Sequence, residues 1–113
     1  MIPLTDNVEW MTALSNDIGY EDVFVEQLRN FAESGDVALA FSGSGNSENV
    51  LRAVQYANQV GCHTVGFSGR KGGKLKDLVQ HSIVVNSDHM GQIEDMHMIL
   101  QHIVCYYFME GLG

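Results

Sequence analysis

Three predicted strands alternate with three helical patterns from residue 36 onward, and this alternation constrains the fold more than any other feature of the sequence. The strands are VALAF (37–41), HTVGFS (63–68) and HSIVVN (81–86). The first is an apolar run without polar alternation, which predicts a buried strand of a parallel sheet. Helical patterns follow at about 47–60, in a short segment after residue 70, and at about 92–110. Strands and helices of these lengths in this order predict right-handed crossovers and an α/β fold, a three-layer parallel sheet flanked by helices.

Two more helices are predicted ahead of the first strand. Residues 5–17 form one, with Thr5 or Asp6 as its cap, and residues 20–33 form the other, with apolar side chains at helical spacing. The chain has one proline, Pro3, and neither an internal repeat nor a low-complexity segment. Residues 1–113 are therefore expected to form one domain.

The last predicted helix is apolar around nearly its whole circumference. A helix of this kind is normally buried on all sides, and a domain of 113 residues has too little other structure to surround it. We therefore expect a homo-oligomer that forms through this C-terminal helix. The apolar positions are Met96, Ile99, Leu100, Ile103, Val104, Cys105, Tyr106, Tyr107, Phe108 and Met109.

The charge and the cysteine content restrict the possible partners and location. Fourteen acidic residues against six basic ones give a formal net charge of −8, which disfavours binding to nucleic acid. No apolar run is long enough to cross a membrane, and the first ten residues do not resemble a secretory signal. Cys62 and Cys105 are predicted to be buried, reduced thiols, which favours a cytoplasmic protein.

A loop rich in serine and glycine, SGSGNS, connects the first strand to the next helix. Such a loop lies at the carboxyl edge of a parallel sheet, where the free N–H groups of the following helix point. Glycines at 43 and 45 let the backbone close around an oxyanion, and the hydroxyls of Ser42, Ser44 and Ser47 add donors. The loop therefore predicts a phosphate site that uses no cationic side chain.

Three other motifs are compatible in part with the same loop. Asn46 or Ser47 could simply cap the helix while the glycines make a turn. The dinucleotide pattern G-x-G-x-x-G fails because Glu48 stands where the third glycine belongs, although an NADP-type site that uses Arg70 is conceivable. The P-loop pattern fails because no G-K-[ST] opens the helix.

The segment SGSGNSENVLRAVQYANQVG resembles the signature of the sugar isomerase (SIS) family, S-x-S-G-x-S followed by a helix. Three further segments, SNDIGYEDVFVEQL, GRKGGKL and IEDMHMILQH, are similar to segments of the phosphoheptose isomerases in that family. The four segments occur in the family's order and cover the chain from about residue 6 to residue 110. The resemblance therefore implies a flavodoxin-like SIS fold.

The resemblance also implies a substrate and an activity. The substrate is a phosphorylated sugar such as sedoheptulose 7-phosphate, whose carbonyl group moves between C1 and C2. Asn16 and Asp17 would contact the sugar, although the same pair is also ordinary chemistry for the end of a helix. The residues implied to hold the phosphate are Ser42, Gly43 through its backbone, Ser44 and Ser47.

On the last helix, the resemblance gives His102 two roles, zinc ligand and acid/base in the proton transfer. Glu94 takes the place of a family glutamine that touches both zinc and substrate. Eight residues of straight helix separate Glu94 from His102 by about 12 Å, so one zinc ion could join them only through long side chains, a distorted helix or different subunits. His97, three residues after Glu94, is expected to be a surface or interface residue.

The sequence also departs from the family. Phosphoheptose isomerases have N-terminal helices, a first strand with a G-N-G-G-S loop, and a helix whose histidine and glutamate complete the zinc site and supply the base. No segment here resembles these elements, which would leave the strand at 37–41 with an unpaired edge. The chain is then a fragment, one half of a split enzyme completed by a companion chain, or a reduced domain that pairs with another copy. Two functions follow as hypotheses: an isomerase that needs the missing elements, or a non-catalytic module for phosphosugar sensing or assembly.

Overall fold

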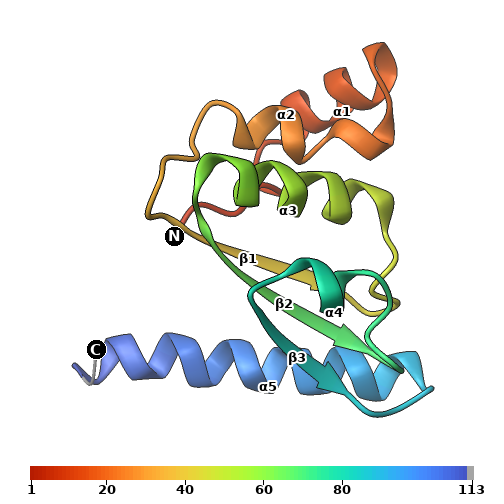
Figure 1. Ribbon diagram of the computed structural model, residues 1–113, viewed down its shortest axis with the longest axis vertical. Coiled ribbons are helices and arrows are strands. Elements are labelled where there is room, and N and C mark those ends of the chain that lie inside the picture. The colour runs from red at the N-terminus through yellow and green to blue at the C-terminus, as the bar shows by residue number, and fades with distance from the viewer. Residues whose placement is uncertain (112–113) are drawn as a thin grey trace.

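The computed structural model describes residues 1–111 and has the predicted α/β architecture (Figure 1). Strands β1 (Val37–Ser42), β2 (His63–Gly69) and β3 (His81–Val85) form a parallel sheet in the order β1-β2-β3. Val37 lies opposite His63 and Val65 lies opposite His81, so the three carboxyl ends meet at one edge. The three predicted strands are thus confirmed, with ends that differ by one residue.

Helices cover both faces of this sheet (Figure 1). Helices α3 (Glu48–Val60) and α4 (Leu75–Leu78) pack on one face, where Leu51, Val54 and Leu75 form a buried cluster. Helix α5 (Met90–Met109) runs along the other face and buries Ile93 against the sheet. Helix α3 ends at Gly61, whose φ of 90° is the left-handed conformation that glycine adopts without strain.

The N-terminal helices differ from the prediction. Helix α1 (Val8–Asp17) is capped by Asn7, whose Oδ1 accepts the Trp10 N–H at 2.9 Å, and not by Thr5 or Asp6. The helix expected at 20–33 is replaced by a 3₁₀ turn, η1 (Tyr20–Asp22), and a single helical turn, α2 (Val25–Leu28). After α2, the Asn30 and Phe31 N–H groups bond carbonyls three positions back, as in a 3₁₀ turn, and the Ala32 N–H bonds the Leu28 carbonyl at 2.8 Å.

Strand β1 is less buried than the sequence predicts. It is an edge strand of the sheet, and only Ser42 among its six residues is buried, whereas 63% of Val37 is exposed. The reason is that α5 packs mainly against β2 and β3, and no strand lies on the other side of β1 within residues 1–111. The expected unpaired edge is therefore present in the part of the chain that is described.

Helix α5 is long and largely uncovered. Only Ile93 and His97 are buried along its 20 residues, and most of its apolar side chains face outward. Cys105 is among the exposed residues, which corrects the prediction of a buried thiol, whereas Cys62 is buried as predicted. Across residues 1–111, no helix combines the length and the apolar character needed to span a membrane.

Candidate functional site

The serine loop, residues 42–47, lies at the carboxyl edge of the sheet, between the end of β1 and the start of α3. Its two ends are joined by a hydrogen bond in which Ser42 Oγ donates to Ser47 Oγ at 3.0 Å. Ser42 is buried and Ser47 is exposed, so the pair of hydroxyls extends from the core to the surface. Between them, the Asn46 N–H donates to Ser44 Oγ at 3.1 Å. The hydrogen bonds within the loop therefore hold all three serine side chains near the first turn of α3.

The alternative that this loop only caps the helix fits the structure poorly. Ser47 stands at the N-cap position but its side chain makes no capping hydrogen bond. Asn46 uses its Oδ1 to accept the Lys74 N–H at 3.0 Å, so it does not cap α3 either. No acceptor within residues 1–111 bonds the backbone N–H groups of Ser47 and Glu48. These donors, together with the positive end of the helix dipole, are free to bind an anion.

A second loop, residues 69–75, packs against the serine loop and is hydrogen-bonded to it. The Leu75 N–H donates to the Gly45 carbonyl at 2.9 Å, and the Gly69 N–H donates to the Gly43 carbonyl at 3.0 Å. Gly45 has a φ of 69°, and a Cβ there would collide with the Gly72 carbonyl, so this position requires glycine for both its conformation and its contact. The serine loop is therefore a packed structure with a fixed shape.

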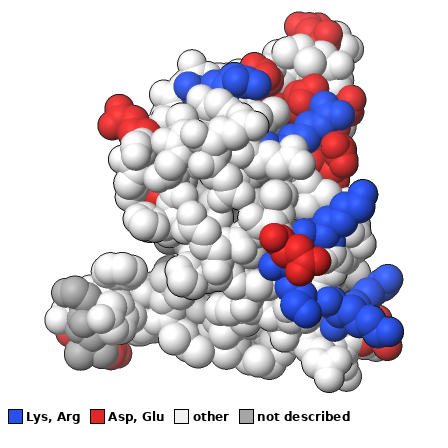
Figure 2. Space-filling model, in the orientation of Figure 1, with Lys and Arg blue, Asp and Glu red and all other residues white. Residues whose placement is uncertain are grey.

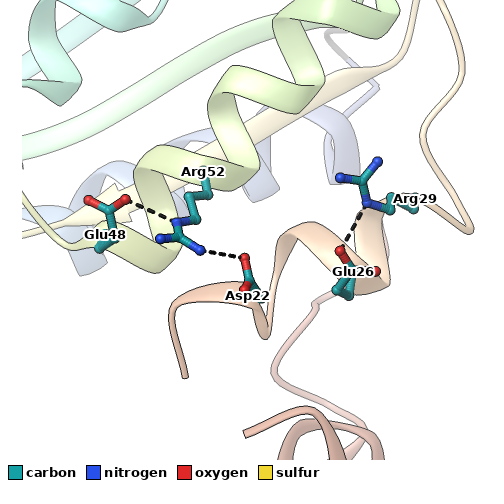
Figure 3. A network of polar contacts seen from close by, with 5 residues as sticks. All are labelled: Asp22, Glu26, Arg29, Glu48 and Arg52. Atoms are coloured by element: carbon teal, nitrogen blue, oxygen red, sulfur yellow. Dashed lines mark hydrogen bonds and ion pairs between the residues drawn. The ribbon is translucent and has the colours of Figure 1, made fainter. Parts of the chain in front are cut away.

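An ion-pair network stands beside the first turn of α3 (Figure 3). The guanidinium of Arg52 bonds Glu48 at 3.0 Å and Asp22 at 2.8 Å, which links α3 to η1. The hydrogen bonds that Arg52 donates to Asp22 and then to Glu48 raise the pKa of Arg52 above its usual value, so this side chain stays charged. Arg52 thereby balances the Glu48 carboxylate, which would otherwise repel an anion at the start of α3.

Asn16 and Asp17 lie at the end of α1, where Asn16 Nδ2 donates to Asp17 Oδ1 at 2.9 Å. Both residues are exposed, and Asn16 lines an open groove of about 570 Å³ beside α1. No residue of the serine loop lines this groove. The groove residues are Val8, Met11, Thr12, Ser15, Asn16 and Tyr20. The groove that Asn16 lines is therefore separate from the predicted phosphate contacts.

Glu94 and His102 are both exposed on α5. The helix starts near the carboxyl edge of the sheet and runs back along its face (Figure 1), so His102 lies farther from that edge than Glu94. Their spacing of eight residues corresponds to about 12 Å along the helix. Residues 1–111 contain no group of three or more His, Cys, Asp or Glu side chains that could hold a metal ion. Glu94 and His102 do not by themselves fit a zinc ion, which needs three or four ligands at about 2 Å.

His97 is not the surface residue that the sequence suggests. It is buried, and its Nε2 lies 3.0 Å from the Ser68 carbonyl oxygen at the end of β2. Because a carbonyl can only accept, Nε2 carries the proton of this hydrogen bond. The ring also contacts Phe41 and Phe67 edge-on. A signal for this burial was available in the sequence, because His97 follows the buried Ile93 by four residues on the same helix face.

The fold and the serine loop at its carboxyl edge match a known class of domain. The family model of the SIS domain matches residues 1–69, and the chain therefore belongs to the SIS domain family. Two solved structures are similar in fold over 92% of this chain. They are phosphoheptose isomerase GmhA from Neisseria gonorrhoeae, with a TM-score of 0.89 and 34% identity, and a phosphoheptose isomerase from Francisella tularensis, with a TM-score of 0.88 and 30% identity.

Within that family, the chain resembles phosphoheptose isomerases. It is 44% identical to the phosphoheptose isomerase of Nitratiruptor sp. and 41% identical to the probable phosphoheptose isomerase of Thermoplasma acidophilum, in each case over 92% of this chain. The aligned region is 56% and 57% of those two relatives, and 59% and 56% of the two solved chains. The chain thus spans little more than half the length of the relatives that it matches.

Proposed function

We propose that this chain binds a phosphorylated sugar at the serine loop and forms part of an aldose–ketose isomerase that acts on sedoheptulose 7-phosphate. The observation that carries the proposal is the uncapped start of α3, where the hydroxyls of Ser42, Ser44 and Ser47 gather beside free backbone N–H groups. This arrangement supplies donors that suit a phosphate dianion. The names of the relatives support the isomerase over a non-catalytic module for sensing or assembly.

The proposed site is shared with another segment or another copy. Isomerisation needs one group to remove a proton beside the carbonyl and one to return it, and His102 is the candidate in this chain. Its place on the outer half of α5 separates it from the serine loop. The site therefore combines the serine loop of one copy with His102 and Glu94 from another copy. Asn16 and Asp17 also come to the site from another copy. Because Glu94 and His102 of one copy lie about 12 Å apart along α5, a zinc ion bound by either would take its other ligands from another copy or from outside residues 1–111, and no reaction step is assigned to it.

Two surfaces support assembly. The exposed apolar side chains of α5 favour a homo-oligomer that forms through this helix, and they include Ile103, of which 60% is exposed, and Phe108, of which 69% is exposed. The open edge of β1 favours pairing with a further strand, from a companion chain or from another segment. We propose that residues 1–113 correspond to the C-terminal portion of one SIS-type domain, in a cytoplasmic protein.

Calorimetric titration with sedoheptulose 7-phosphate tests the binding site. The double variant Ser44→Ala and Ser47→Ala removes two hydroxyl donors and is expected to weaken binding by ~2–4 kcal/mol. Ser82→Ala is the matched control, because Ser82 is an exposed serine of β3 outside the loop. Equal affinity of the double variant and the control would refute the assignment of the phosphate to this loop. An isomerisation assay of the purified chain, alone and with any companion chain, tests the activity.

A further inference from the structure

Four of the six basic residues of the chain lie within residues 70–76, and all four are exposed. We call Arg70, Lys71, Lys74 and Lys76 the cationic rim. Figure 2 shows basic side chains gathered at the right of the molecule, over the loop that follows β2 and over α4. No ion pair involves the rim within the described part of the chain, whereas the two remaining cations, Arg29 and Arg52, are both paired with carboxylates.

The backbone of the rim is attached to the serine loop. The Lys74 N–H donates to Asn46 Oδ1 at 3.0 Å, and the next residue, Leu75, donates to the Gly45 carbonyl at 2.9 Å. At the other end of the rim, the Arg70 N–H donates to the Ser87 carbonyl at 3.0 Å. These bonds hold the backbone of the rim beside the serine loop, so its flexible charged side chains all start from positions next to that loop.

Arg70 has an unusual backbone conformation within the rim. Its φ of 55° makes it the one residue other than glycine with positive φ in residues 1–111, and this conformation is unfavourable for a side chain of its size. Glycine would fit the same backbone without strain, as it does at Gly72 and Gly73 in the same loop. The sequence instead places a guanidinium there, next to Lys71.

The electrostatic argument follows from the charge of the whole chain. A net charge of −8 repels an anion at long range, and the serine loop itself contains no cation. Cations without an ion pair beside the loop make the local potential more positive, and an exposed cation acts through water over roughly one Debye length, about 10 Å at 0.1 M salt. Two carboxylates adjoin the rim. Asp77 follows Lys76, and Asp88 follows Ser87, whose carbonyl accepts the Arg70 N–H. The residues from Arg70 to Asp77 still contain four cations and one carboxylate.

We propose that the cationic rim attracts the doubly charged phosphate ester to the serine loop by its field, without direct ligation, and so selects dianionic sugars over uncharged ones. This inference rests on the proposed function. The serine loop and the start of α3 bind the phosphate at close range by hydrogen bonds. The rim does not contact the phosphate but raises the local concentration of the dianion. The effect of the rim therefore depends strongly on salt, whereas the contacts of the serine loop depend on it much less.

The test uses the full chain and two double variants that change the net charge equally. Lys71→Gln with Lys74→Gln removes two rim charges, and Gln59→Glu with Gln80→Glu adds two negative charges at exposed positions toward the opposite end of the sheet. Calorimetry with sedoheptulose 7-phosphate is run at about 20 mM and about 300 mM ionic strength. The rim variant is expected to bind about threefold to tenfold more weakly at low salt and less than about twofold more weakly at high salt. The control variant is expected to change less than about twofold at either salt concentration.

Several results would overturn the inference. If both variants weaken binding equally at low salt, the net charge of the chain matters and the rim does not. If the rim variant loses as much affinity at high salt as at low salt, its lysines are direct ligands. If the rim variant binds as tightly as the original chain, the rim has no role. In each of these cases the original chain still binds, so the proposed function stands; absence of binding by the original chain would refute both.

Discussion

Substitution of Gly45 by alanine tests the packing that gives the serine loop its shape. Gly45 has a φ of 69°, so alanine there first costs about 1 kcal/mol of backbone strain. Its Cβ would also overlap the Gly72 carbonyl, a backbone atom that cannot move without displacing residues 69–75. Displacement breaks the hydrogen bond from Leu75 to Gly45 and the one from Lys74 to Asn46, each of which contributes about 0.5–1.5 kcal/mol. We expect Gly45→Ala to lower the free energy of unfolding by about 2–4 kcal/mol.

Gly35→Ala is the matched control, because Gly35 also has a positive φ, 94°, but has no atom within 4 Å of the added Cβ. It should lose only the strain of about 1 kcal/mol. Urea unfolding followed by far-UV circular dichroism measures both variants against the original chain. The reasoning is wrong if the two alanine variants unfold at the same urea concentration, because the contact between the two loops would then contribute nothing.

The other predictions concern buried side chains. His97→Phe keeps a ring beside Phe41 and Phe67 but leaves the buried Ser68 carbonyl without its donor. The free energy of unfolding should therefore fall by about 1–3 kcal/mol. A variant as stable as the original chain would contradict the role of this hydrogen bond. Iodoacetamide should leave the buried Cys62, whose pKa is raised by burial and then by Asp36, unmodified in the folded protein and should alkylate it after unfolding in urea, which mass spectrometry measures. The pKa of Cys62 is higher in the folded chain than in the unfolded chain, so its contribution to stability is complete below the unfolded pKa and is lost as the pH rises through the folded pKa. Urea unfolding at increasingly alkaline pH tests this assignment. The original chain should lose stability as the pH rises, whereas Cys62→Ser should not.

The strands and α3 could be predicted because their signals are local. Each strand contains β-branched or aromatic residues in a short segment, and α3 ends at a glycine whose left-handed conformation stops a helix. The segment at 20–33 could not be predicted in the same way, because tertiary contacts decide its shape. The buried side chain of Gln27 donates to the Leu4 carbonyl at 3.0 Å, a bond to a residue 23 positions away that no helical spacing reveals.

The candidate site also has features that the sequence predicts and contacts that it does not predict. The sequence predicts the loop after β1 and its hydroxyls, because the order of strand, loop and helix sets where they lie. It does not predict that Ser42 bonds Ser47, or that the Gly45 backbone packs on Gly72, because these contacts depend on how two loops meet. The roles proposed for Asn16 and His102 depend on contacts between copies or with a further segment, which neither the order of elements nor one copy of the chain contains.

The open edge of β1 has a consequence for handling the protein. Every second residue of this six-residue strand presents its backbone N–H and C=O on the open side, and such a row is a template for intermolecular strand addition. Preparations of residues 1–113 without a pairing strand should therefore self-associate increasingly with concentration and warming, with growth of thioflavin fluorescence. A short peptide that occupies this edge would act as a stabilising additive.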